Sequence, residues 1–208
     1  MQSPVIPIIA AQAGIAVAAA AYFYKRETQP PPPSTSSPSE PLNPDTVLKA
    51  AASIVKATRS YGFVCTTPPN SRAPPQCRVM DLHKLTDDSL EFGLISRTFT
   101  RKAESLRSNS ACTIAFHDPR ASSEAGYLVL SGEAREIKNV EERRSLWKPS
   151  WSFFHPGPHS EEVVQWRFVP NRLELQSNLT GITDDWQPVT ALKSEKKWAL
   201  QPRRGAKS

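Results

Sequence analysis

Three basic residues stand where the sequence predicts that a strand and the first turn of a helix meet. Arg78 precedes two apolar residues, and Arg101 and Lys102 end a loop rich in Thr and Arg. Unpaired backbone N–H groups at a helix N-terminus favour an anion, and nearby cations add to that preference. The predicted chemistry is the binding of a phosphate group. The competing interpretation is that all three are solvated surface charges.

The elements that position these cations lie within residues 78–109. Apolar Val79 and Met80 continue a strand from the first cation, and Leu90–Ser96 is predicted to be a second strand. A polar loop then leads into a helix predicted over Arg101–Ser108. Strand, turn, strand and helix would therefore bring the three cations together.

The domain around this stretch is predicted to be mainly β. Asn43, Pro44 and Asp45 indicate a helix start, and apolar residues spaced by three and four predict one buried face up to about Ser60. A further helix is predicted over 139–148. Six strands are predicted, over 61–66, 76–84, 89–96, 110–117, 125–137 and 162–177, the last being a long final strand interrupted near Pro170. This pattern predicts a closed antiparallel barrel with peripheral helices.

The N-terminal part differs in composition. Residues 5–24 form an uncharged, Ala-rich run, long enough as a helix to cross a bilayer, and Lys25 and Arg26 follow it. This predicts segment 1–26 to be a membrane anchor with the domain facing the cytosol. A cleaved targeting segment, which would leave the domain in the cytoplasm or an organelle, and a packed soluble helix are the alternatives. Residues 27–43, rich in Pro and Ser, are predicted to be an extended linker.

Charge argues against a nucleic-acid partner. The chain has 208 residues and a net charge of +6, but residues 193–208 alone carry six cations and one acid. The body of the protein is then close to neutral, so a basic binding face is not predicted. The length allows one domain, predicted over 44–200, followed by a basic tail over 201–208.

The cysteines and histidines do not predict a metal site. The three cysteines, Cys65, Cys77 and Cys112, lack metal-ligand spacing, and the four histidines are scattered. Cys65 and Cys77 flank a Pro-rich loop and could face each other across a hairpin. Reduced, half-buried thiols are nevertheless the expected state, with a disulfide as the alternative.

Several motifs in order resemble the pyridoxamine 5'-phosphate oxidase-like family of FMN-binding split-barrel proteins. They are Arg78-Val79-Met80, Leu94-Ile95-Ser96 with Thr100-Arg101-Lys102, the segments LRSNSACTIAFHDP and YLVLSGEAREI, and the block RRSLWKPSWSFFHPGPHSEEVVQWRFVPNRLEL. The last block is similar to the general-stress-protein branch. The resemblance covers roughly residues 44–200, and the stretch that grips the substrate phosphate in authentic pyridoxamine phosphate oxidases is not found.

The resemblance implies a split barrel that binds FMN. Arg78 and Lys102 would contact phosphate or ribityl oxygens, Arg101 would add a third cation at the phosphate end, and Thr100 belongs to the same cofactor-binding motif. Val79, Met80, Ile95 and Ser96 would line the flavin ring. In this family the flavin lies between two subunits, which implies a homodimer with late aromatic residues near the ring. The candidates are Trp147, Trp151 and Trp166, of which Trp151, with Phe153 and Phe154, is preferred.

The function implied is that of an FMN-dependent oxidoreductase acting on an unknown small molecule. No acid–base pair is evident, and His117 and His155 are the only candidate proton carriers. One alternative is a non-catalytic flavin-binding redox or stress module. A less favoured alternative is a heme-binding relative that uses His155 or His159.

Overall fold

A computed structural model describes residues 42–70, 72–85, 89–118, 126–177, 187–195 and 197–202. All of them belong to the second of the two units into which the chain divides, Glu40–Ser208. Segment 1–26, nearly all of the linker and most of the tail lie outside the described residues, so membrane association through residues 5–24 stays a prediction. Within the described ranges, no helix is both long enough and apolar enough to cross a bilayer.

The first described helix, α2 (Pro44–Ala57), begins as the sequence predicts. The side chain of Asn43 accepts a hydrogen bond from the backbone N–H of Thr46 at 2.9 Å. The helix buries one apolar face, formed by Val47, Ala50, Ala51, Ile54 and Val55. It ends three residues before the predicted Ser60, because Arg59 and Ser60 take positive φ angles of 54° and 61°, which no helix accommodates.

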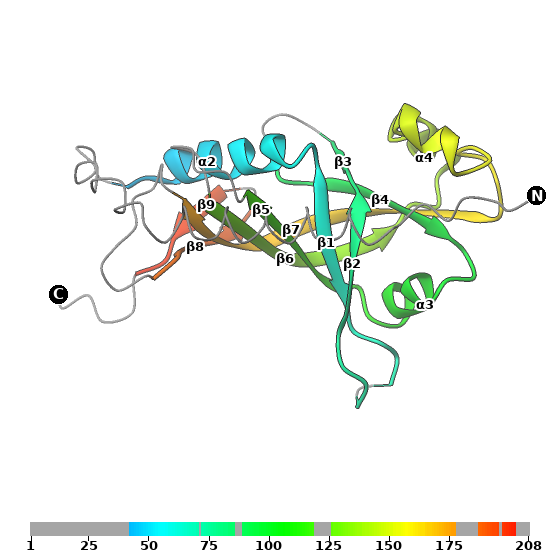
Figure 1. Cartoon of the computed structure of the whole chain (residues 1–208), viewed down its shortest axis with the longest axis horizontal. Coiled ribbons are helices and arrows are strands. Elements are labelled where there is room, and N and C mark those ends of the chain that lie inside the picture. Colours follow the sequence, from blue (N-terminus) through cyan, green and yellow to red (C-terminus); the bar gives the residue numbers. More distant parts are fainter. Residues whose placement is uncertain are drawn as a thin grey trace, which may run out of the picture. The chain divides into compact units, whose positions relative to one another are not determined.

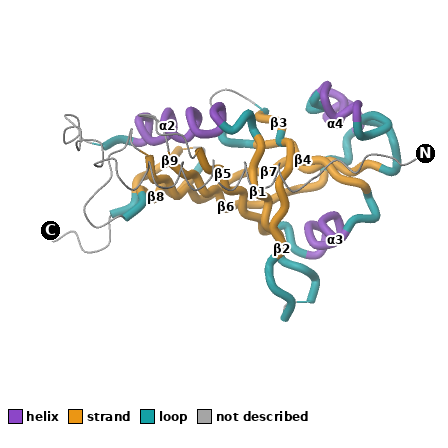
Figure 2. Tube along the Cα trace, viewed as in Figure 1, coloured by secondary structure: helices purple, strands orange, loops and turns teal. Residues whose placement is uncertain are grey.

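Strands dominate the rest of the described chain (Figure 1). The nine strands are β1 (Tyr61–Thr66), β2 (Gln76–Asp81), β3 (His83–Lys84), β4 (Phe92–Arg97), β5 (Ala111–Asp118), β6 (Gly126–Glu136), β7 (Val163–Ser177), β8 (Val189–Ser194) and β9 (Lys197–Leu200). The other helices are α3 (Arg101–Ser108), α4 (Val140–Ser145) and the 3-10 helix η1 (Pro149–Phe153). Figure 2 shows the helices outside the strands, as predicted; α2 packs against β5 and β6, and α3 against β1 and β4.

All strand pairs are antiparallel and belong to one sheet, in the order β2-β1-β5-β6-β7-β4-β3, with β8 and β9 added beside β7. Strands β2 and β3 stand at opposite ends of this order, yet only Leu82 separates them in the chain. The sheet must therefore curve until its two ends meet, which is the geometry of a barrel. Its interior is filled by apolar side chains that include Phe92, Phe116 and Phe168.

Two predictions about the strands are wrong in detail. The predicted strand 76–84 breaks at Leu82, and β7 is not the last strand, because β8 and β9 follow it. The predicted irregularity near Pro170 is present but lies in the pairing: opposite Ser131 and Gly132 the register shifts. A Cβ atom at Gly132 would lie 2.2 Å from the carbonyl oxygen of Val169, so this close approach of two backbones requires glycine.

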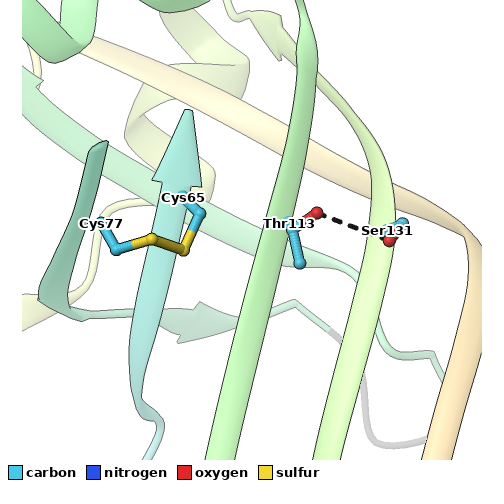
Figure 3. Close-up of a disulfide and its surroundings, with 4 residues drawn as sticks. All are labelled: Cys65, Cys77, Thr113 and Ser131. Carbon is cyan, nitrogen blue, oxygen red and sulfur yellow. Dashed lines mark hydrogen bonds between the residues drawn. A yellow bond between two sulfur atoms is a disulfide. The ribbon is translucent and has the colours of Figure 1, made fainter. Parts of the chain in front are cut away.

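Strands β1 and β2 are joined by a disulfide, contrary to the expected reduced thiols. The register places Cys65 directly opposite Cys77, and the two side chains form a disulfide (Figure 3). The hairpin loop between them fixes this register, and local sequence patterns do not reveal it. Thr113 and Ser131 extend the same cross-strand row over β5 and β6, with their hydroxyl oxygens 3.4 Å apart. The third cysteine, Cys112, is free and buried.

Candidate functional site

Strand β2 carries Arg78 and Met80 on the inner face of the sheet and Val79 on the outer face. Side chains alternate along a strand, and the exposure agrees, because Met80 is buried and Val79 is 60% exposed. Nη2 of Arg78 donates to Oε1 of Gln76 at 2.5 Å. Its Nη1 is buried and has no hydrogen-bond partner among the described residues. An anion would satisfy this otherwise costly buried donor.

The loop between β4 and α3 fixes the start of the helix. Thr100 caps α3: its Oγ1 accepts from the N–H of Ala103 at 3.3 Å and lies 2.6 Å from Oγ of Ser96. The cap places Arg101 and Lys102 at the first two helical positions, as the sequence predicts. Arg101 is exposed, whereas Lys102 is half-buried and reaches toward β2 and β4.

Lys102 is an ammonium group with few partners. Its Nζ lies 3.2 Å from Sδ of Met80 and donates to the carbonyl oxygen of Ile95 at 3.3 Å. Within the described part of the chain, no carboxylate pairs with it. Burial, and secondarily the positive charge of Arg78, lower the pKa of Lys102 from 10.5 to about 8. The site therefore holds a half-buried cation that has no anionic partner among the described residues.

We expect Lys102→Met to stabilise the ligand-free protein. The folded pKa lies below the unfolded value, so the penalty is complete below pH 8 and disappears as pH rises from about 8 to 10.5. Removing the charge should add roughly 1–3 kcal/mol at pH 7, and it should flatten the rise of stability between pH 8 and 10. Urea unfolding at several pH values measures both, with exposed Lys138→Met as the control. A lower free energy of unfolding for Lys102→Met than for the wild type would contradict the claim that the half-buried ammonium group destabilises the ligand-free protein.

The segment after η1 brings His155 to this cluster. Its backbone N–H donates to the carbonyl oxygen of Trp151 at 2.9 Å, and the adjacent Phe154 carbonyl accepts from Nη2 of Arg97 at 3.3 Å. Nδ1 of His155 is buried and lacks a partner among the described residues. Burial and the positive charges of Arg97 and Lys102 lower the pKa of His155. This imidazole is therefore neutral near pH 7.

Neither Arg97 nor His155 is among the cofactor-binding residues predicted from the sequence. Arg97 is the last residue of β4 and directly follows Ser96. Its place in the sequence, beside the loop predicted to bind phosphate, could have identified it as a candidate. His155 lies far along the chain, and only the packing of the η1 segment brings it near α3. The other predicted proton carrier, His117, is exposed on β5, and exposed His159 interacts with Arg144.

Trp151 is buried and does not form part of the exposed surface. It is 2% exposed and packs with Ile95 and Val163 in a small apolar cluster separate from the main core. Trp147 packs edge-on against its ring, and Trp166 lies in the main core. The exposed aromatic residues of this region are Phe153 and Phe154, which are 85% and 75% exposed. Trp151 thus anchors the segment that carries them.

The structure brings together Arg78, Met80, Ile95 and Lys102, and adds Arg97 and His155. It does not bring Val79 or Arg101 to this cluster, since Val79 lies on the outer face and Arg101 is exposed. The only carboxylate found at the cluster, among the described residues, is that of Glu162, which is 65% exposed and forms an ion pair with Arg97. Positive charge is therefore in excess, and the arrangement can bind an anion such as a phosphate.

A second group of cations surrounds a cavity of about 560 Å³ beside α2. Its basic lining residues are Lys49, Lys56, Arg59 and Lys84. Lys49, Lys56 and Arg59 are exposed, and two of them lie near the C-terminus of α2, where the helix dipole favours cations. Ordinary solvation and the dipole account for this group, which is distinct from the cluster at β2 and α3.

Solved structures share this fold. A protein related to general stress protein 26, of the pyridoxinephosphate oxidase family, from Clostridium acetobutylicum has a TM-score of 0.57 at 19% identity, over 71% of this chain and 95% of that one. A pyridoxamine 5'-phosphate oxidase-related, FMN binding protein from Nostoc punctiforme has a TM-score of 0.53 at 14% identity, over 77% and 96% of the chains.

A heme binding protein from Mycobacterium smegmatis has the same fold, with a TM-score of 0.51 at 14% identity over 67% of this chain and 61% of that one. No family model matches the sequence, and no curated protein is similar to it. At these identities the likeness concerns the fold, which is the mainly β antiparallel fold of the pyridoxamine 5'-phosphate oxidase-like proteins, as the resemblance predicts.

Proposed function

We propose that the protein binds FMN and that Arg78 and Lys102 hold its phosphate. The observation that carries this proposal is a half-buried pair of cations that faces no carboxylate in the described chain and includes the unpaired Nη1 of Arg78. A phosphate dianion would supply acceptors for both groups. The FMN-binding protein from Nostoc punctiforme, which shares the fold, supports the choice of ligand.

The other residues predicted to bind the cofactor would have supporting roles in the site. Thr100 and Ser96 hold the loop that presents Arg101 and Lys102. Met80 and Ile95, which are 8% and 6% exposed, lie next to the ammonium group, and we propose that the flavin ring begins beside them. Trp151 holds the η1 segment, and exposed Val79 would meet the ring only across a subunit interface.

Absorption spectroscopy of the purified full-length protein tests the proposal. We expect a flavin spectrum, either as isolated or after FMN is added and excess is removed. A protein that retains no FMN would refute the proposal, and a Soret band would instead support the heme-binding alternative. For that alternative His155 is a candidate ligand, because its Nδ1 is buried and unpaired within the described residues.

The reaction is proposed to be an oxidation or reduction of a small molecule. Bound FMN would supply hydride and electron transfer, while the chain's own residues would bind and orient it. Among the described side chains, the site offers no carboxylate–histidine pair for proton transfer, which keeps a non-catalytic flavin-binding role as the second candidate. Reduction of the bound flavin by NADH or NADPH, followed by reoxidation, would separate an enzyme from a binder.

A homodimer is proposed through the outer face of β2, β1, β5 and β6. Two adjacent cross-strand rows there carry no charged side chain. Phe63 and Val79, directly opposite each other, are 50% and 60% exposed. An exposed, uncharged apolar patch of this kind is typical of the centre of an interface, and a second copy presents the same surface.

We expect Phe63→Arg to weaken the dimer. A charge in each copy would be buried without a partner, so the dimer dissociation constant should rise at least about tenfold. Light scattering over a concentration series measures it, and Leu192→Arg on β8, outside this face, is the control. A wild-type monomer, or a variant that dimerises as before, would contradict the proposed interface.

A further inference from the structure

His155 belongs to the anion site by position, although it carries no charge in the free protein. Its Nδ1 is buried and unpaired within the described chain, while its backbone is fixed by Trp151. Two cations act on it, Arg97 at the end of β4 and Lys102 at the start of α3. Arg97 also donates to the carbonyl oxygen of the adjacent Phe154 and forms an ion pair with Glu162, just before β7. Arg78 on β2 is connected to this group of charges because its positive charge acts on Lys102.

We propose that His155 is a further ligand of the bound phosphate, neutral in the free protein and protonated in the complex. This inference rests on the proposed function and goes beyond it, since it assigns a role and a protonation change to a residue outside the predicted phosphate clamp. Among the described residues no free carboxylate stabilises an imidazolium at His155, because Glu162 is already paired with Arg97 and is mostly exposed.

The sign of the protonation change follows from the charges. In the free protein, burial and two cations disfavour the imidazolium, so the pKa of His155 lies below its ordinary value. A phosphate dianion placed among Arg78, Lys102 and His155 reverses the local charge, and an opposite charge at contact distance favours the protonated form. Binding of the phosphate therefore takes up a proton from solvent.

Proton uptake makes binding depend on pH. Each proton taken up on binding makes the affinity change tenfold per pH unit, and affinity must fall as pH rises. Lys102 adds to the same direction at higher pH, because its pKa of about 8 would also rise in the complex. The contribution of His155 is then the part of the effect that disappears when only this residue is changed.

Isothermal titration calorimetry of the full-length protein with FMN at pH 7, in buffers of different ionisation enthalpy, counts the protons. We expect the wild type to take up at least about half a proton more than His155→Asn, which keeps a hydrogen-bonding side chain but does not titrate. The FMN affinity of the variant should be about tenfold lower at pH 6 and nearly equal at pH 8.5. His155→Gln serves as a second variant if Asn disturbs the fold.

Two controls make the result specific. His159→Asn changes an exposed histidine that interacts with Arg144, so its proton count should match the wild type. Riboflavin, which has the ring but no phosphate, should bind without the proton uptake that depends on His155. Equal proton counts for the wild type and both His155 variants, with FMN still bound, would refute the proposed role of His155 and leave the proposed FMN binding intact. Failure of the wild type to bind FMN would overturn the proposed function as well.

Discussion

The Arg78→Ala/Lys102→Ala protein is expected to bind FMN at least about 100-fold more weakly than the wild type. Each hydrogen bond to a charged group contributes roughly 1.5–3 kcal/mol, and both cations face the same proposed phosphate. Removing them also removes the positive charge that the structure leaves without a carboxylate partner in the described chain. Quenching of flavin fluorescence on titration of the protein into FMN measures the two affinities.

The control replaces the same residue types at exposed positions, Arg72→Ala/Lys138→Ala, and should bind FMN as the wild type does. Lys102→Met alone adds a second check, because it is expected to be more stable than the wild type and yet to bind FMN poorly. A weak binder that is also a stabilised protein cannot owe its loss of affinity to misfolding. Unchanged affinity of the double variant would move the phosphate away from β2 and α3.

Loss of the Cys65–Cys77 disulfide should lower the free energy of unfolding by about 2–4 kcal/mol. The two residues are 12 apart in sequence, and a cross-link over a loop of this size restricts the unfolded chain by about that amount. Strand β2 is at the end of the sheet order and pairs with β1 alone among the described strands, so the disulfide adds a covalent link to that pairing. Since β2 carries Arg78 and Met80, FMN affinity should fall as well.

Urea unfolding of Cys65→Ser/Cys77→Ser, beside the wild type with and without a dithiol reductant, measures this effect. The reductant should destabilise the wild type and leave the variant unchanged. Cys112 does not complicate the comparison, because it is buried and burial raises the pKa of its thiol to about 12, which keeps it from acting as an exchanging thiolate. Equal stability of wild type and variant would show that β2 holds its place without the bond.

Local signals in the sequence predict much of the architecture. The strand over 61–66 is found with the predicted bounds, because a β-rich run is followed by a Pro-rich turn. The helix over 101–108 is also found, and Thr100 gives the physical reason, since its side chain caps the first turn. The fold then brings β2 and the start of α3 together, so that Arg78 and Lys102 are neighbours, as the order of the motifs predicts.

Features that depend on register or distant packing could not be predicted in this way. The pairing of Cys65 with Cys77 needs the exact offset of two strands, which the hairpin loop sets. Burial of Trp151 depends on contacts with Ile95 on β4 and Val163 on β7, which are two separate strands. His155 reaches the cluster for the same reason. A single sequence shows which residues could bind an anion, but packing decides which of them face it.

The disulfide also connects the protein to the redox conditions of its surroundings. Disulfides persist in oxidising compartments and are rare in the cytosol, whereas Lys25 and Arg26 predict a domain on the cytosolic side. Cys77 is exposed in a single copy of the chain, so it is open to thiol exchange while the outer face of β2 is not covered by the proposed second copy. In an oxidising compartment the disulfide keeps β2 joined to β1, and we expect a protein that binds FMN as proposed to retain it. In a reducing one, the fraction of protein loaded with flavin would follow the ratio of thiols to disulfides around it.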